Sequence, residues 1–266
     1  MKNHNLPDTQ NTTDVRNINI NEVGIKDIMH PIEFINREQE SCSTVANFTM
    51  TVGLPSEVKG THMSRFVEVL NEVECSFSTQ SFLDLVKTVA QKLNSDSAHV
   101  VVNFPFFRKK SAPISGVESL MDYHVTLSGA VKSGEVNLSL KVVVPVTSLC
   151  PCSKSISKYG AHNQRSHITI EAKASKGHDL YIEDLIDLAE EKASCDLYAI
   201  LKREDEKVVT ERAYDNPAFV EDVVRDIALE LNKNQKIGYY VLESENFESI
   251  HNHSAYALIR NHKQIL

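Results

Sequence analysis

Apolar and polar residues alternate along much of the chain, in runs that are typical of strands with one buried face. We predict such strands over Val45–Leu54, Thr61–Leu70, Val100–Phe107, Tyr123–Val131, Val136–Val146, His167–Ala174, Ile237–Glu243 and Ala255–Ile259. Apolar residues three or four apart instead predict helices, which we place over Phe82–Leu93, Leu180–Ala193 and Phe219–Leu231. Strands that follow one another in pairs, with helices between the pairs, indicate an α+β fold with antiparallel sheets.

Two short patterns recur in the same order along the chain, which indicates an internal duplication. Residues Gly60–Arg65 and Gly160–Arg165 share G-x-H-x-x-R, and we expect each to open a strand. Residues Val86–Asn94 and Val224–Asn232 share V-x-x-x-A-x-x-L-N at the end of a predicted helix. Each pattern is short enough to arise by chance, but their shared order favours two copies of a ββ-helix-ββ unit.

The duplication and the local composition divide the chain into three parts. Residues 1–22 are polar and rich in Asn, and we predict a flexible tail there. Residues 23–132 and 133–266 are expected to form the first and the second unit. The second copy carries an insert, at about residues 177–217, in which charged residues are dense. We therefore expect most of the chemistry in the second unit.

The composition is that of a globular protein, with 41% hydrophobic and 24% charged residues among 266. Because 28 basic residues face 36 acidic ones, the net charge of −8 argues against nucleic acid or an anionic membrane as a partner. No apolar stretch reaches the roughly 18 residues of a membrane span, and the N-terminus has no secretory signal. The five cysteines are few and odd in number, so we expect a reduced, cytoplasmic protein without a disulfide framework.

The segment Val142–His167 is the richest in chemically reactive side chains. A predicted buried strand ends at Cys150-Pro-Cys152, a loop rich in Ser and Lys follows, and His162 opens the next strand. Loops at strand ends are where rigid scaffolds present reactive groups. Thiolate and imidazole both bind Zn, Fe or Mn-class ions, and Cys150 and His162 could meet across the turn. The alternative is a pair of buried thiols beside solvated histidines.

Two further clusters of charged residues lie in the second half. Glu206 is expected in a loop, and Pro217 predicts the first turn of a helix that would hold Glu221 near its positive end. An ionised carboxylate there can complete a metal site or accept two hydrogen bonds from a guanine edge. Glu248 and His251 are three residues apart between the last two predicted strands, so a turn would pair them as acid and base. Solvated loops are the alternative for both clusters.

Four segments together resemble the GTP cyclohydrolase IB family of prokaryotes. They are PVTSLCPCSKSISKYGAHNQRSH (145–167), LKREDEKVVTERAYDNPAFVEDVVRD (201–226), ESENFESIHNHSAYA (243–257) and KGTHMSRFVE (59–68). The resemblance implies a tandem tunnelling fold of two ββααββ-type units, with antiparallel sheets and helices on one face. It also implies that the chains assemble into β-barrels, as a homotetramer with active sites at subunit interfaces.

The resemblance further implies hydrolysis of GTP to 7,8-dihydroneopterin triphosphate and formate, the first step of tetrahydrofolate biosynthesis. The implied cofactor is a divalent metal ion, Mn or Zn, with Fe or Mg as further candidates. The residues that match the family's metal site are Cys150, Glu206, His162 and His251. Catalytic roles are implied for Cys150, His162, Glu248 and His251. Substrate binding is implied for Glu221, Arg165, His167, Lys154 and Lys202.

Other kinds of protein would show different residues. The NADPH-dependent nitrile reductase of the tunnelling fold should carry a lysine in an E-S-x-K-x-x-Y motif, but Glu118–Tyr123 read E-S-L-M-D-Y. A non-catalytic pterin- or purine-binding protein should lack one of Cys150, Glu206 and Glu221, and all three are present. A zinc-stabilised structural module needs four ligands at close spacing, and C-x-C alone does not supply them.

Overall fold

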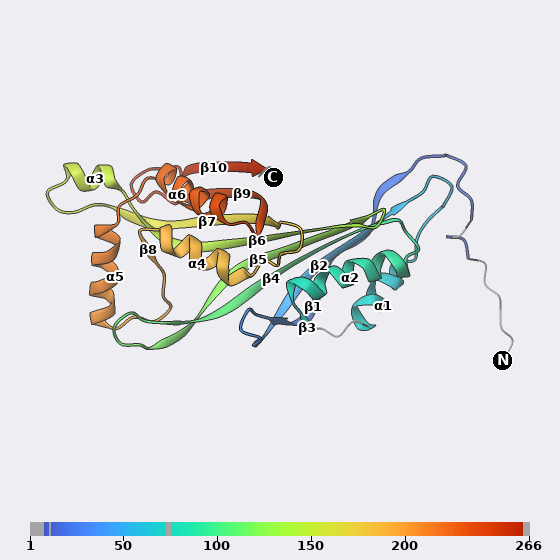
Figure 1. The fold of residues 1–266 in the computed structure, drawn as a ribbon, viewed down its shortest axis with the longest axis horizontal. Helices are drawn as coiled ribbons and strands as arrows, with labels where there is room; N and C mark the ends of the chain where they lie inside the picture. The colour runs from blue at the N-terminus through green and yellow to red at the C-terminus, as the bar shows by residue number, and fades with distance from the viewer. Residues whose placement is uncertain (1–7, 11, 73–75, 263–266) are drawn as a thin grey trace. The chain divides into compact units, whose positions relative to one another are not determined.

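The computed structural model describes residues 8–10, 12–72 and 76–262 (Figure 1). Residues 1–7 and 11, which belong to the predicted tail, lie outside the described residues, and so does Cys75.

The order of the elements repeats once along the chain. The first set comprises β1 (Ile20–Ile35), β2 (Ser41–Leu54), α1 (Met63–Glu72), β3 (Ser76–Phe77), α2 (Thr79–Lys92), β4 (Ser97–Ser111) and β5 (Glu118–Lys132). The second comprises β6 (Glu135–Leu149), α3 (Pro151–Ile156), β7 (Asn163–Ala174), α4 (Ile182–Lys192), β8 (Cys195–Asp196), α5 (Arg203–Asp215), α6 (Val220–Lys233), β9 (Ile237–Asn246) and β10 (Ala255–His262). Apart from the short elements β3, α3 and β8 and the additional helix α5, each set reads ββααββ, which confirms the predicted α+β fold of two such units.

The contacts within the chain define two compact units. Unit 1 comprises Met1–Phe34, Ser43–Asn103 and Leu127–Leu138, and unit 2 comprises Ile35–Cys42, Phe104–Thr126 and Ser139–Leu266. Neighbouring strands follow the order β10-β9-β7-β6-β5-β4 in unit 2 and β6-β5-β4-β2-β1-β3 in unit 1. The strands β4, β5 and β6 contribute residues to both units. The duplication placed the boundary between the two repeated units at residues 132 and 133. This boundary remains a prediction, because the compact units are defined by contacts and not by the repeat.

The predicted flexible tail over residues 1–22 extends too far, because β1 already begins at Ile20. Before β1, Thr13 forms a bridge with Val58, and the Asp14 amide donates to the carbonyl of Glu57 at 3.0 Å. Backbone hydrogen bonds, which polar composition does not reveal, hold this segment.

Close packing in unit 1 brings helix α2 against strand β5. Phe82 and Val86 lie on the buried face of α2, and both approach Gly129 of β5. A Cβ at Gly129 would lie 2.7 Å from the Val86 Cγ2 and 2.8 Å from the Phe82 ring. Glycine is therefore required there, since any side chain would push the helix off the sheet.

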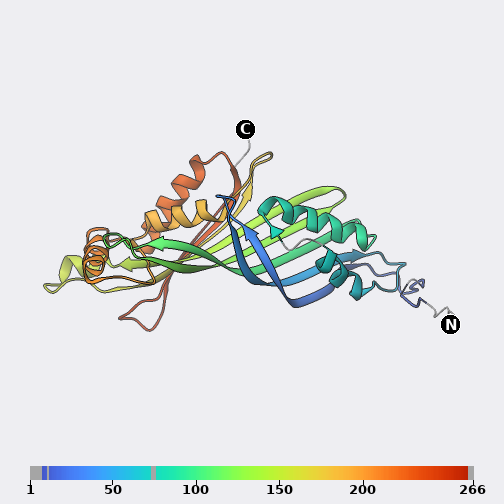
Figure 2. The same cartoon turned by 90° about the horizontal axis from the view of Figure 1, so that it is seen from below.

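In unit 2, helices α4 and α6 cover one face of the strands (Figure 2). Their apolar residues recur at helical spacing, for example Leu185 and Ile186 in α4 and Ile227 and Leu231 in α6, and all are buried. The facing strand residues alternate, so that every second side chain of β6, β7 and β9 enters the core. The face of these strands that α4 and α6 do not cover carries many polar side chains.

Strand β1, helix α1 and helix α5 differ from the prediction, which placed no strand before Val45. Residues Thr61–Leu70, predicted as a strand, lie mainly in helix α1, whose buried residues Phe66, Val69 and Leu70 are spaced three and four apart. The prediction mistook the helical period for alternation.

The region around Glu206 is helix α5 and not the predicted loop, whereas the helix predicted from Pro217 begins three residues later, at Val220. The two G-x-H-x-x-R patterns also differ in context. The first leads into α1 and the second into β7, so they do not occupy equivalent positions. By contrast, Val86–Asn94 and Val224–Asn232 both close the last helix before a strand, as predicted.

Candidate active site

The turn between β6 and β7 joins the first two candidate residues. The Cys150 amide donates to the carbonyl of His162 at 3.2 Å, next to the last ladder pair of the two strands. Cys150 is also the N-cap of the short helix α3, and its Sγ accepts a hydrogen bond from the Ser153 amide at 3.4 Å. The backbones of Cys150 and His162 thus lie next to each other across the turn, as predicted.

His162 lies at the centre of a small polar cluster. Its Nδ1 is 2.9 Å from the Gln164 Oε1, 3.4 Å from the Ser249 Oγ and 4.0 Å from the Glu248 Oε2. Glu248 in turn lies 3.5 Å from the Nδ1 of His251, in the loop between β9 and β10. The predicted pairing of Glu248 and His251 is confirmed, and Gln164, which the sequence analysis did not single out, also contacts His162.

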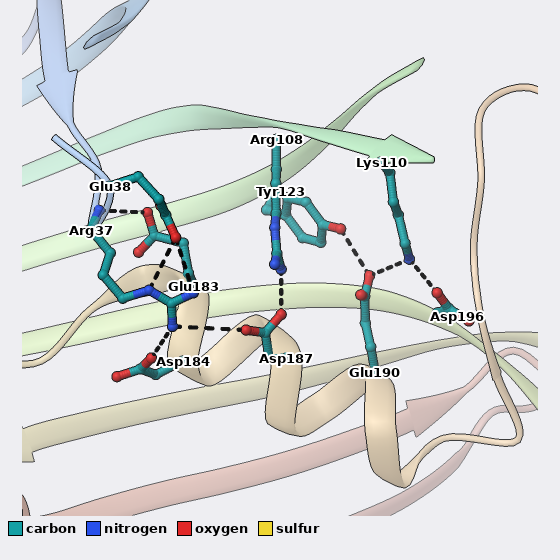
Figure 3. Close-up of polar contacts among 10 residues, drawn as sticks. All are labelled: Arg37, Glu38, Arg108, Lys110, Tyr123, Glu183, Asp184, Asp187, Glu190 and Asp196. Atoms are coloured by element: carbon teal, nitrogen blue, oxygen red, sulfur yellow. Dashed lines mark hydrogen bonds and ion pairs between the residues drawn. The ribbon is translucent and has the colours of Figure 1, made fainter. Parts of the chain in front are cut away.

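Helix α4 contacts β4 through a row of ion pairs and β5 through a hydrogen bond (Figure 3). The Lys110 ammonium lies 2.8 Å from the Glu190 Oε1 and 2.7 Å from the Asp196 Oδ2. The Tyr123 hydroxyl donates to the same Glu190 oxygen at 2.8 Å. Arg108 binds Asp187 one turn earlier on the helix. Because the Lys110, Glu190 and Asp196 side chains are only 11–16% exposed, these pairs are shielded from water.

Asp196 connects this row to helix α5. Its Oδ1 lies 3.3 Å from the Arg212 guanidinium, near the end of α5. Burial raises the pKa of Asp196, but the hydrogen bond and charge of Lys110 outweigh burial and leave the pKa lowered. Burial raises the pKa of the neighbouring Cys195 thiol to about 11, so this cysteine is not a reactive thiolate.

A second carboxylate, Asp205, holds the other end of α5. It is fully buried and accepts hydrogen bonds from the Lys202, Ile114 and Ser115 amides at 2.8, 2.8 and 2.9 Å. The Ser115 hydroxyl donates to it at 2.6 Å. Burial alone would raise the pKa of Asp205, but these donors lower it. The sequence analysis missed Asp205, although an acidic residue three positions after a helix start is a capping signal.

Glu206 and Glu221 lie at opposite ends of α5. Glu206 is exposed in the first turn of α5, while Glu221 is exposed in the first turn of α6, which follows the end of α5. At 1.5 Å per residue, about 13 Å of helix axis separates Glu206 from Asp215. Helix α5 therefore places Glu206 at the end opposite to the one that leads into α6. Lys202 is exposed beside Glu206.

The Lys154 ammonium already has partners within the chain. It donates to the backbone carbonyl of Tyr214, and it lies 4.2 Å from the centre of the Tyr214 ring. This contact ties α3 to the end of α5, so a ligand would have to compete for Lys154.

Arg165 and His167 lie together at a cavity of about 350 Å³. Both point to the strand face opposite α4 and α6, and His124 of β5 lines the same cavity. The His167 ring meets the Phe247 ring edge to face, with centres 4.8 Å apart. Burial lowers the pKa of His167. The candidate substrate-binding residues thus lie in four places: Arg165 with His167, Lys154 against Tyr214, Lys202 near Glu206, and Glu221 in the first turn of α6.

The donor types fit a divalent metal ion, but one chain does not complete a site. Thiolate and imidazole suit Zn or a similar ion, and the turn places Cys150 and His162 side by side along the backbone. Among the residues that the structure describes, however, no three His, Cys, Asp or Glu side chains are grouped so that they could hold one ion.

Solved structures with the same fold are urate oxidases. A hyper-thermostable AgUricase mutant superposes with a TM-score of 0.57 over 92% of both chains, at 9% identity. The urate oxidase of Bacillus sp. TB-90 gives 0.53 over 92% of this chain and all of its own, again at 9% identity. Such distant likeness shows the fold alone, and that fold is the tunnelling fold. Within the described residues, no helix has the length and apolar character needed to cross a membrane.

Sequence comparison then identifies the family. The family model for type I GTP cyclohydrolase folE2 matches residues 6–257, and the chain belongs to this family. GTP cyclohydrolase FolE2 of Vesicomyosocius okutanii is 69% identical over 97% of this chain and 98% of its own. The same-named proteins of Ruthia magnifica and Dechloromonas aromatica are 68% and 56% identical, over 97% and 98% of this chain and 98% and 96% of theirs. None of these matches favours the nitrile reductase, the non-catalytic binding protein or the structural zinc module.

Proposed function

We propose that this protein hydrolyses GTP to 7,8-dihydroneopterin triphosphate and formate, the reaction that opens tetrahydrofolate biosynthesis. Membership of the GTP cyclohydrolase family, together with the grouping of His162, Glu248 and His251 beside Cys150, carries the proposal. The reaction adds water to purine C8, opens the imidazole ring, releases C8 as formate and recloses the ring with ribose carbons. Because GTP is the substrate, we also expect the protein in the cytoplasm.

The chain's donor atoms suit a divalent ion, Mn or Zn, with Fe or Mg as alternatives. Cys150 and His162 of one chain would be its first ligands, and His251 and Glu206 would complete the site only after moving toward the ion or when supplied by a second copy. The bound ion would supply Lewis acidity for the attack of water on C8 near neutral pH. The absence of three grouped ligands among the described residues of one chain supports an active site at a subunit interface, and we propose the homotetramer with its β-barrels on this basis.

Proton transfer falls to the pair of Glu248 and His251 and to His162. Ring opening and formate release both require protonation of a purine nitrogen, which an imidazole can perform near neutral pH. The 3.5 Å contact lets the Glu248 carboxylate orient the His251 ring and stabilise its protonated form. Gln164 and Ser249 contact the His162 Nδ1, so they keep that ring in a fixed orientation.

The two ends of the substrate need opposite charges. Glu221 would accept hydrogen bonds from the guanine N1–H and N2–H₂, and adenine offers no matching pair of donors. Its place in the first turn of α6 favours the ionised carboxylate. Arg165, His167, Lys154 and Lys202 would bind the triphosphate. These side chains would supply a local positive charge in a chain whose net charge is −8.

Glu221→Gln tests the assignment of the two glutamates. The amide nitrogen of glutamine would face a guanine donor with another donor, and each lost charge-assisted bond costs about 1.5–3 kcal/mol. We expect GTP affinity and kcat both to fall, since guanine binding also positions C8. Bound metal should stay unchanged, whereas Glu206→Gln should lose metal. A Glu221→Gln protein that lost metal but bound GTP normally would reverse the two assignments.

A further inference from the structure

Unit 1 contains a row of three polar side chains that the proposed GTP site does not use. Glu22 on β1, His99 on β4 and Ser128 on β5 come from three different strands. The Ser128 Oγ lies 3.0 Å from the His99 Nε2, and the Glu22 Oε1 lies 3.3 Å from the His99 Nδ1. A hydroxyl, an imidazole and a carboxylate in this order form the arrangement that activates serine nucleophiles.

The carboxylate decides which imidazole nitrogen carries the proton. An ionised Glu22 can only accept, so its oxygen 3.3 Å from the His99 Nδ1 favours the tautomer that carries the proton on this nitrogen. Nε2 is then left with a lone pair, and it accepts the hydrogen bond of the Ser128 hydroxyl. This is the tautomer that a general base needs in order to take a proton from serine.

The strands that carry the three residues are well supported. His99 pairs with Thr51 of β2 in the antiparallel ladder, and the Thr51 hydroxyl contacts the His99 carbonyl at 3.5 Å. Ser128 precedes Gly129, the residue that packs directly against Phe82 and Val86 of α2. Side chains that extend from paired strands keep their mutual distances better than those on loops.

A cavity of about 880 Å³ in unit 1 brings a substrate to the Glu22 and His99 end of the row. Ser128 is half-buried and does not line this cavity, but its Oγ lies 3.0 Å from the His99 Nε2. Glu22 and His99 line the cavity, and 35% of the His99 side chain is exposed. Its other lining residues include apolar side chains and several hydrogen-bond donors. The apolar ones are Val52, Leu54, Ala98, Ala130 and Val131, and the donors are Asn19, Asn21, Asn94 and Lys132. A neutral, short-chain ester fits such a mixed lining.

We propose that Glu22, His99 and Ser128 form a second catalytic site, which hydrolyses small carboxylic esters. The Ser128 Oγ forms a bond to the ester carbonyl carbon while its proton passes to the His99 Nε2. The carbon–oxygen bond to the alcohol then breaks, and the leaving alkoxide takes that proton. Water attacks the acyl-Ser128 in the same way, releasing the carboxylic acid and restoring the serine. The amide and ammonium donors that line the cavity are available to the transient oxyanion.

The test uses the full-length protein, a fluorophosphonate probe and p-nitrophenyl acetate. We expect the probe to form a covalent adduct that peptide mapping places on Ser128. Ser128→Ala should lose the adduct and hydrolyse the ester about 100-fold more slowly or worse. Ser97→Ala is the matched control, because Ser97 lines the same cavity but is not part of the row. This control should keep both the adduct and the rate.

Glu22→Gln tests whether the three residues act together. It should slow both labelling and ester hydrolysis by at least tenfold, because the amide no longer stabilises the imidazolium. The absence of an adduct on Ser128 in the wild-type protein would overturn the proposal. So would an ester rate that is the same in wild type and Ser128→Ala, or one that Glu22→Gln leaves unchanged. GTP turnover is not measured in this test, so its outcome is independent of the proposed cyclohydrolase activity.

Discussion

The removal of the Lys110 ammonium should destabilise the protein strongly. Lys110 neutralises both Glu190 and Asp196, and these three side chains are only 11–16% exposed. Lys110→Met keeps most of the side-chain volume but leaves the buried Glu190 carboxylate without its cation, and Asp196 with Arg212 alone. The loss of one partner of a buried ion pair typically costs about 3–5 kcal/mol. At about 2 °C per kcal/mol for a chain of this length, Tm should fall by about 6–10 °C at pH 7.

Lys207→Met is the matched control for thermal unfolding. Lys207 pairs with Glu211 on α5, but these side chains are 69% and 57% exposed, so its loss should cost about 0.5 kcal/mol or less. The difference between wild type and Lys110→Met should also depend on pH. Because the folded pKa of Asp196 is lowered, its stabilising contribution is present above about pH 4 and is lost as pH falls through the lowered pKa. The difference in Tm between wild type and Lys110→Met should therefore become smaller below about pH 4. Equal Tm values for the two variants at pH 7 would refute this reasoning.

Two further substitutions test the candidate active site. Cys150→Ala should lose bound metal and metal-dependent turnover, measured by elemental analysis and product formation. Cys152→Ala should be milder because Cys152 is exposed in helix α3. Equal losses would mean that the pair is wrongly assigned. Asp205→Asn would turn an amide group toward the backbone donors at the start of α5, so Glu206 should shift. Metal affinity should then fall by about tenfold in a direct titration. Unchanged affinity in a folded variant would show that Asp205 does not position Glu206.

Much of the fold follows from periodicity, because most elements have one buried face. The strands β4 to β7 and the helices α2, α4 and α6 were predicted close to their observed bounds. Helix α5 was missed for a physical reason. Only Asp205 and Ala213 are buried along it, so it lacks an apolar stripe and depends on hydrogen bonds at its ends. Those bonds come from Ile114 and Ser115, about ninety residues earlier in the chain.

The candidate site was predictable where its residues are close in sequence. Cys150 and His162 flank one turn, and Glu248 and His251 share one loop, so local geometry brings each pair together. Glu206 was predicted in a loop but lies in helix α5, whose lack of an apolar stripe hides it from a periodicity analysis. The row of Glu22, His99 and Ser128 has no local sequence signal, because strand register alone brings these residues together.

The most direct test of the account is the product analysis of GTP turnover. The purified protein, stripped of metal and then supplied with Mn or Zn, is incubated with GTP, and formate and the fluorescent oxidised pterin are measured. We expect one formate for each dihydroneopterin triphosphate, and neither product without metal or with ATP in place of GTP. If neither formate nor pterin forms with any divalent metal, or if only phosphate is released from GTP, the proposed function is wrong.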